Sequence, residues 1–127
     1  MSASLYSIEG TVIRGAHYGT VLGFPTANLD RSACAKAKGI PLGVYAGIAT
    51  THDKKRYRAG IVIGPLEKDV LPKIEAHLLD FSGDLYGRAM LLSLVSFLRP
   101  FEDFIDDADL KKQIASDIEN IRKIISL

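Results

Sequence analysis

Short apolar segments separated by turn-forming residues predict a chain that is built mostly from β-strands. The predicted strands cover residues 5–14, 43–49, 56–63, 73–81 and 88–99, and a further strand edge follows the glycine-rich stretch 15–28. Residues 51–55, 64–65 and 82–84 read as turns, and 66–72 as a loop. Strands that follow one another through turns indicate an antiparallel barrel or sandwich rather than a parallel sheet.

Two segments change to a helical pattern. Asp30 can cap a short alanine-rich helix through Lys38, with Gly39 as its stop. Near the C-terminus, apolar residues recur every three or four positions and form one helical stripe, which comprises Leu110, Ile114, Ile118, Ile121 and Ile125. Asp106 and Asp107 supply N-cap candidates. We expect this amphipathic helix to cover one end of the barrel.

Composition limits the class of protein. The chain has 127 residues, which suits a single domain over residues 1–127. Lys and Arg number 16 against 15 for Asp and Glu, so no net positive field favours nucleic acid. The single cysteine, Cys34, allows no internal disulfide and fits a reducing compartment. The N-terminus does not resemble a signal peptide, and the run 89–98 is too short to span a bilayer. We therefore expect a cytoplasmic monomer that binds neither nucleic acid nor membrane.

The glycine-rich stretch is the first candidate for chemistry. Glycines recur every fourth residue at positions 15, 19 and 23, and Pro25 stiffens the chain just before Thr26 and Asn28. Such a loop can turn backbone N–H groups toward a phosphate. Thr26 and Asn28 would share one face of an extended chain, and their oxygens suit a hard cation such as Mg²⁺. The alternative is a tight turn before a strand, and neither a Walker A motif nor G-x-G-x-x-G is present.

Glu75 is the second candidate. In a strand Glu75 shares a face with His77, Leu79 and Phe81, and Ile74, Ala76 and Leu78 lie on the other face. Because both faces are largely apolar, Glu75 is expected to be partly buried on either one. A carboxylate in that position needs a partner or a chemical task. Periodicity alone favours a pairing with a nearby Lys or Arg over a catalytic role. We interpret His77 as structural and His52 as solvated.

Three blocks together resemble the riboflavin kinase family. The first is Gly-x-x-x-Gly-x-x-Leu-Gly-Phe-Pro-Thr-Ala-Asn-Leu at residues 15–29. The second is Ile-Glu-Ala-His-Leu-Leu-Asp-Phe at 74–81, followed by Asp-Leu-Tyr-Gly at 84–87. The third is Leu-Arg-Pro at 98–100, followed by Phe104 and by matches that continue into the C-terminal helix. The similarity extends from Gly10 to about Asp117 and also includes Pro-x-Gly-Val-Tyr-Ala at 41–46.

This resemblance implies a fold, a reaction and residue roles. The implied fold is a six-stranded antiparallel Greek-key barrel with a C-terminal α-helix. The implied reaction uses ATP as co-substrate with Mg²⁺ or another divalent cation, and it converts riboflavin to FMN and ADP. Glu75 would be the general base, because an ionised carboxylate can accept the proton of the ribityl 5′-hydroxyl. Arg99 would lie beside the flavin, although a salt-bridged strand end is an equally good interpretation. The residues implied to hold phosphate and metal are Gly15, Gly19, Gly23, Pro25, Thr26 and Asn28, with Thr26 and Asn28 on the metal.

Two departures from the family pattern leave alternatives open. Val62 stands where relatives usually carry Asn or Ser, and Asp106-Asp107 stand where relatives often carry Ser-Leu. These changes favour, as a second hypothesis, a flavin- or nucleotide-binding module without turnover. A third hypothesis is a flavin-using redox protein on a similar barrel, in which Thr26, Asn28 and Glu75 would have no purpose. No further domain is readable before Leu5, so we expect no FAD synthesis by this chain.

Overall fold

Six strands and two helices make up the described part of the computed structural model. The structure describes residues 4–14, 26–66, 71–100 and 104–127. The elements in chain order are β1 (Tyr6–Ile13), β2 (Ala27–Leu29), α2 (Arg31–Lys36), β3 (Gly43–Thr51), β4 (Arg56–Leu66), β5 (Pro72–Leu78), β6 (Ala89–Arg99) and α3 (Asp107–Ile124).

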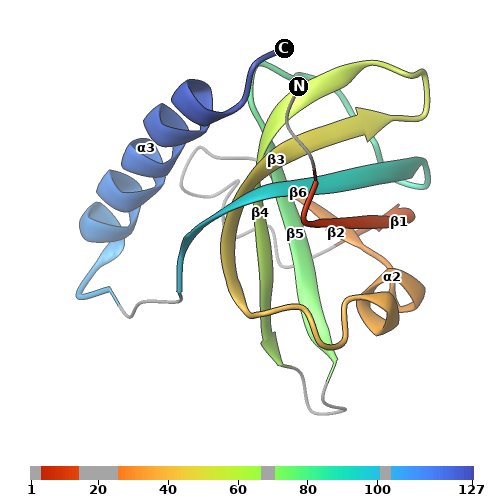
Figure 1. The fold of residues 1–127 in the computed structure, drawn as a ribbon, viewed down its shortest axis with the longest axis horizontal. Helices are drawn as coiled ribbons and strands as arrows, with labels where there is room; N and C mark the ends of the chain where they lie inside the picture. Colours follow the sequence, from red (N-terminus) through yellow and green to blue (C-terminus); the bar gives the residue numbers. More distant parts are fainter. Residues whose placement is uncertain (1–3, 15–25, 67–70, 101–103) are drawn as a thin grey trace.

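The strands close into an antiparallel barrel with the order β1-β2-β5-β4-β3-β6 (Figure 1). The long ladders join β3 to β4 and to β6, whereas β2 contributes only three residues between β1 and β5. The closed mainly β barrel with a C-terminal helix confirms the expected fold class.

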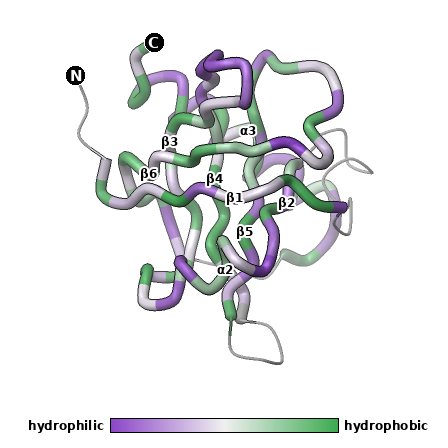
Figure 2. Tube along the Cα trace, turned by 90° about the vertical axis from the view of Figure 1, so that its right-hand side faces the viewer, coloured by the Kyte–Doolittle hydropathy of each residue, from purple (hydrophilic) through white to green (hydrophobic). Residues whose placement is uncertain are grey.

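Buried and partly exposed side chains alternate along the strands, which separates an inner core from an outer wall. On β5 the side chains of Ile74, Ala76 and Leu78 are buried, whereas Lys73, Glu75 and His77 between them are partly exposed. The main core gathers inward-facing residues of all six strands, and apolar segments accordingly run along the strands in Figure 2. Tyr45 belongs to this core and donates its hydroxyl to the Pro41 carbonyl oxygen at 2.7 Å.

Helix α2 joins the main core. The Asp30 carboxylate accepts a hydrogen bond from Ala33 N at 3.1 Å, as expected of an N-cap, and the helix ends at Lys36. Ala33 and Ala37 are fully buried in the main core. A side chain at Gly10 would collide with Ala33, so the close approach of β1 to α2 requires glycine there.

Helix α3 packs on the outer wall of the barrel, so the prediction that it covers one end is wrong. Its residues Ile121 and Ile125 form a second cluster with Ala46 and Leu79, and Ala46 faces outward from β3. The predicted apolar stripe is real, and it meets the outward face of β3 and β4, where the small, outward-facing Ala46 lets the helix pack closely. Asp106 is the N-cap and accepts a hydrogen bond from the backbone N–H of Asp109.

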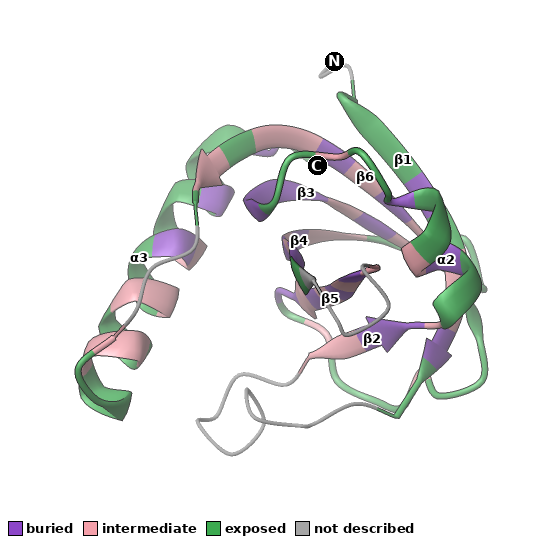
Figure 3. Cartoon of the chain, turned by 90° about the horizontal axis from the view of Figure 1, so that it is seen from below, coloured by how far each residue is buried: buried purple, intermediate pink, exposed green. Residues whose placement is uncertain are grey.

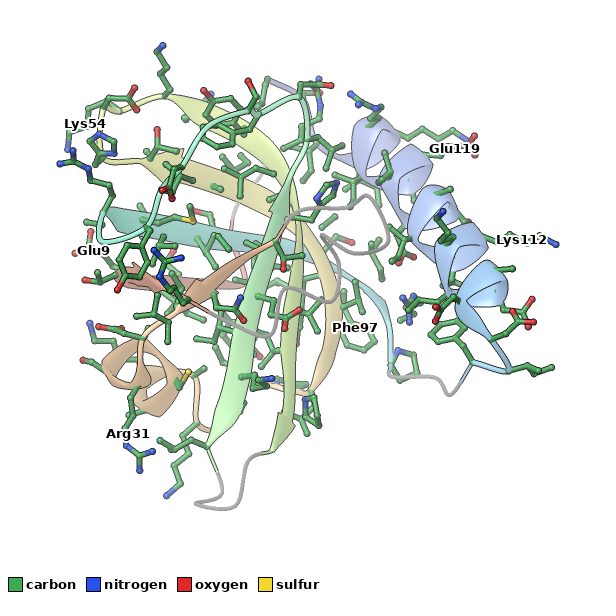
Figure 4. The ribbon with its side chains drawn as sticks, turned by 180° about the vertical axis from the view of Figure 1, so that it is seen from behind. Glu9, Arg31, Lys54, Phe97, Lys112 and Glu119 are labelled. Atoms are coloured by element: carbon green, nitrogen blue, oxygen red, sulfur yellow. The ribbon has the colours of Figure 1, made fainter. Side chains whose placement is uncertain are left out.

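Only the C-terminal half of α3 is firmly docked. Its buried residues are Asp117 and Ile121, whereas the first turns carry exposed and half-buried residues (Figure 3). Lys112 and Glu119 point away from the barrel (Figure 4). Arg122 donates two hydrogen bonds to the Asp80 carboxylate, at 2.9 and 3.0 Å. Arg58 Nε donates to the Ile125 carbonyl oxygen at 2.7 Å. The N-terminal half of α3 therefore projects beside the outer wall.

Two strand boundaries differ from the sequence-based expectation. The ladder of β4 continues past Gly64-Pro65 to Leu66, which pairs with Pro72, and an irregularity interrupts the register between Ile63 and Leu66. The Gly-Pro pair is therefore accommodated within the strand instead of ending it. Strand β5 stops at Leu78 rather than at residue 81, because Asp80 adopts a left-handed backbone conformation with φ +62°.

Candidate active site

The candidate site is centred on β2, the shortest strand. Asn28 pairs with Ile13 of β1 on one side and with Glu75 of β5 on the other. Directly paired residues of antiparallel strands point to the same face, with Cβ atoms about 5 Å apart. Glu75 belongs to the outward-facing set of β5, so the metal-ligand candidate and the base candidate lie side by side on the outer wall. Asn28 is only 6% exposed, whereas Glu75 is partly exposed.

Thr26 lies immediately before β2 and borders a hollow of about 170 Å³. The hollow lies between the end of β1, the start of β2 and β5, and the segment 81–86 forms its rim. His77, Phe81 and Tyr86 give it aromatic walls, Arg14 contributes a positive charge, and Asp84 on the rim contributes a negative one. Aromatic faces and a cation beside a hydroxyl oxygen suit a ligand that carries both a flat ring and an anion.

Asn28 borders a second hollow of about 220 Å³ on the other side of β2. This hollow is lined by residues of β1, α2 and the start of β5, and its charged lining residues are Arg14, Arg31 and Lys73. Thr26 and Asn28 therefore border different hollows that share Ile13 and Arg14. Among the described residues, Glu75 lines neither hollow, although its neighbours Ala76 and Ile74 on β5 line the first and the second hollow respectively.

One row of paired residues crosses the outer wall from Asn28 to Arg99. Glu75 pairs with Val62 of β4, Val62 with Val44 of β3, and Val44 with Arg99 of β6. Three ladder steps separate Glu75 from Arg99, which is roughly 14 Å along the wall. Arg99 therefore does not belong to the immediate surroundings of Glu75, but it lies on the same row.

Arg99 joins the end of β6 to α3. Its Nε donates to Asp117 Oδ1 at 3.1 Å, and its Nη2 donates to Asp117 Oδ2 at 2.9 Å. The two side chains are 15% and 10% exposed. Gln113 Nε2 adds a third donor to Asp117 Oδ1 at 3.0 Å, and the Arg99 guanidinium carbon lies 5.8 Å from the Phe104 ring centroid. The salt-bridge interpretation of Arg99 is confirmed, and its role beside a flavin stays a prediction.

Some predicted site residues lie outside the described part of the chain. These are Gly15, Gly19, Gly23 and Pro25. Among the described residues, no group of three or more His, Cys, Asp or Glu side chains is arranged to hold a metal ion. The oxygen donors near β2 are the Thr26 hydroxyl, the Asn28 amide and the Glu75 carboxylate. Such a set fits a hard divalent cation that takes its remaining ligands from phosphate and water.

Two features of the site were not expected from the sequence. Arg14 stacks on Tyr86, with the guanidinium carbon 4.4 Å from the ring centroid. Its position directly before Gly15 was a signal that could have identified it. Asp117 was noticed only as part of the family pattern, although a carboxylate four residues from both Gln113 and Ile121 lies on the apolar side of the helix and therefore needs a partner.

Comparisons with known proteins agree with this arrangement. The family model described as riboflavin kinase matches residues 3–125. The RNA-binding riboflavin kinase RibR of Bacillus subtilis (strain 168) is 36% identical in an alignment of 124 positions that covers 94% of this chain and 51% of that protein. The chain thus spans about half the length of this relative. The riboflavin kinase of Homo sapiens is 31% identical in an alignment of 127 positions that covers 96% of this chain and 82% of the human protein.

A solved structure shows the same fold. The crystal structure of riboflavin kinase from Trypanosoma brucei superposes with a TM-score of 0.71 at 23% identity, over 93% of this chain and 78% of that chain. The β1-β2-β5 site is therefore built on the barrel that this structure also has. Because the family match covers almost the whole sequence, the chain belongs to the riboflavin kinase family.

Proposed function

We propose that this chain is an ATP-dependent riboflavin kinase that transfers the γ-phosphoryl group of ATP to the ribityl 5′-hydroxyl of riboflavin, giving FMN and ADP. Membership of the family supports this activity, as does the similarity to a human protein named riboflavin kinase over most of that protein's length.

The pairing of Asn28 with Glu75 carries the proposal. These residues are 47 positions apart in the sequence, and the register of β2 against β5 makes them direct neighbours. A phosphoryl transfer needs a group that accepts the hydroxyl proton close to the group that holds the phosphate-bound cation. A structural role alone would not require a carboxylate and an amide on this row.

The chemistry assigns one task to each residue. The Glu75 carboxylate accepts the proton of the 5′-hydroxyl while the oxygen forms a bond to the γ-phosphorus. The bond between the γ-phosphorus and the β–γ bridging oxygen breaks, and ADP leaves. Thr26 and Asn28 would hold a divalent cation, Mg²⁺ being the candidate, which when bound neutralises charge on the phosphate oxygens.

The two substrates would approach Glu75 from different sides. The hollow at Thr26, with its aromatic walls and Arg14, suits the nucleotide. The row from Glu75 to Arg99 runs toward the projecting half of α3, where Phe104 and Arg99 lie. An elongated molecule such as riboflavin could reach Glu75 with its ribityl chain and place its ring near Arg99.

The direct test is incubation with riboflavin, ATP and MgCl₂, followed by chromatographic separation of FMN from riboflavin. We expect FMN and ADP in equal amounts, and no FMN when EDTA is in excess. A Glu75→Gln variant is the matched control, because it keeps the side-chain shape and removes the proton acceptor. Saturable riboflavin binding without any FMN would refute the kinase activity.

That negative result would favour the second candidate, a binding module without turnover. One observation supports this candidate: the departure at Val62 lies directly beside Glu75. A polar side chain at this position could hydrogen-bond to the carboxylate or to a substrate, and valine cannot. Val62→Asn should raise kcat if the missing polar group limits turnover, and the FMN assay measures this directly.

We further propose a cytoplasmic monomer that does not bind nucleic acid. The near balance of 16 basic and 15 acidic residues supports the last point. No helix in the described ranges is long and apolar enough to cross a membrane. Because the Bacillus relative is named RNA-binding, a gel-shift titration with RNA at low salt is the appropriate check. Retarded RNA at micromolar protein would contradict the proposal.

A further inference from the structure

Arg14 is an exposed residue at the rim of the hollow that Thr26 borders. It directly follows β1, and its guanidinium carbon lies 4.4 Å from the centroid of the Tyr86 ring. Both side chains line the hollow together with Thr26. Arg14 also lines the second hollow, beside Asn28. It therefore shares a hollow with each of the two residues that are proposed to hold the cation.

The backbone holds Tyr86 in this place. Gly87 N donates to the Val12 carbonyl oxygen, and Val12 N donates to the Arg88 carbonyl oxygen, each at 2.9 Å. Tyr86 N donates to Asp84 Oδ1 at 2.8 Å, which closes a turn. These contacts tie the turn to the end of β1. The ring thus provides a flat support that orients the guanidinium and leaves its positive charge in place.

The sequence around the hollow leaves few sources of positive charge. Residues 15–29 contain neither Lys nor Arg. Among the described residues that line the hollow at Thr26, Arg14 is the one lysine or arginine. A nucleotide phosphate chain carries several negative charges, and a guanidinium binds phosphate oxygens through paired, charge-assisted hydrogen bonds.

We propose that Arg14 is a phosphate-binding residue that contacts the phosphate chain of the nucleotide, with Tyr86 as the support that orients it. The proposal rests on the proposed kinase function and adds to it the residue that neutralises phosphate charge beside the Thr26–Asn28 pair. It requires no movement of β1 or of the 84–88 turn. Glu75 remains the only proton acceptor in the reaction.

The test compares ligands with and without phosphate. Dissociation constants for MgADP, adenosine and riboflavin are measured by titration calorimetry on the wild type and on Arg14→Met. Arg56→Met is the matched control, because Arg56 is an exposed arginine at the start of β4 outside both hollows. We expect Arg14→Met to weaken MgADP binding about tenfold or more. Adenosine and riboflavin binding should change less than about twofold, and Arg56→Met should bind all three like the wild type.

Arg14→Lys separates charge from structure. It keeps a cation but loses the planar stack on Tyr86, so its MgADP affinity should lie between those of the wild type and Arg14→Met. Unchanged MgADP binding in Arg14→Met would overturn the role of Arg14. If the wild type forms FMN in the same series, the kinase function would still stand. An equal loss of affinity for adenosine and MgADP would also overturn the role of Arg14, because Arg14 would then support the shape of the hollow or contact the adenine ring. A wild type that binds MgADP but forms no FMN would refute the kinase function alone.

Discussion

Replacing Asp117 should destabilise the protein strongly, because this carboxylate is the main partner of a nearly buried guanidinium. Arg99 and Asp117 are 15% and 10% exposed and are joined by hydrogen bonds of 2.9, 3.1 and 3.2 Å. In Asp117→Ala the described contacts that remain for the Arg99 guanidinium are a long hydrogen bond of 3.4 Å to the Pro100 carbonyl oxygen and the Phe104 ring, whose centroid lies 5.8 Å away. Gln113 also loses its acceptor.

The size of the effect follows from the burial of the pair. Breaking a buried ion pair by removing one partner costs about 3–5 kcal/mol, and slight exposure places this pair at about 3 kcal/mol. For a chain of this length, that loss lowers Tm by about 10 °C. Asp117→Asn removes the charge but keeps an acceptor oxygen for Arg99 or Gln113, so it should lose about half as much.

The assay is thermal unfolding followed by circular dichroism, with urea titration as a second measure. Asp80→Asn is the matched control, since it removes another carboxylate that pairs with an arginine through two hydrogen bonds. Asp80 and Arg122 are 66% and 46% exposed, so solvent and salt screen this pair. Asn also tolerates the left-handed backbone at position 80. Equal losses in Asp117→Ala and Asp80→Asn would refute the argument from burial.

Four further measurements test the site and the fold. Glu75→Gln should lower kcat by about 10²- to 10⁴-fold in the FMN assay with MgADP affinity unchanged, and a wild-type kcat would exclude Glu75 as the base. Thr26→Ala and Asn28→Ala should each raise the Mg²⁺ concentration needed for half-maximal rate, and an unchanged Mg²⁺ dependence would contradict their assignment as ligands. Gly47→Ala should unfold at clearly lower urea concentration, because its Cβ would overlap a carbonyl oxygen of β6. A urea midpoint equal to that of the wild type would show that the strands can shift to accommodate the methyl group. The hydrogen bonds from its arginine partner lower the pKa of Asp80, so its stabilisation is present above the ordinary carboxyl pKa and is lost as the pH falls through the lowered value. The difference in urea midpoint between wild type and Asp80→Asn should therefore vanish in strong acid. A difference that grows in acid would show that folding raises, rather than lowers, the pKa of Asp80.

Local pattern was enough to predict most of the fold. Alternation of apolar and polar residues predicts the strands, and the three-to-four residue spacing of apolar residues predicts the C-terminal helix. The cap prediction for Asp30 is confirmed, and of the two candidates Asp106 and Asp107 the N-cap is Asp106. These features depend on neighbours within a few residues, which a sequence displays directly. The place of α3 could not be predicted in this way. An apolar stripe shows that a helix is covered on one side, but either the inner core or the outer wall of the barrel could have covered it.

The sequence also identified Thr26, Asn28 and Glu75 as candidates, through their chemistry and their resemblance to the family. It could not show that Asn28 and Glu75 are paired, because register between strands 47 residues apart depends on how the whole barrel closes. The same holds for Arg14 on Tyr86 and for Arg99 on Asp117, which are contacts between segments distant in the chain. The sequence alone thus determined which residue types are available, and the closure of the barrel decided which of them meet, because only a fixed register brings distant side chains to the same face.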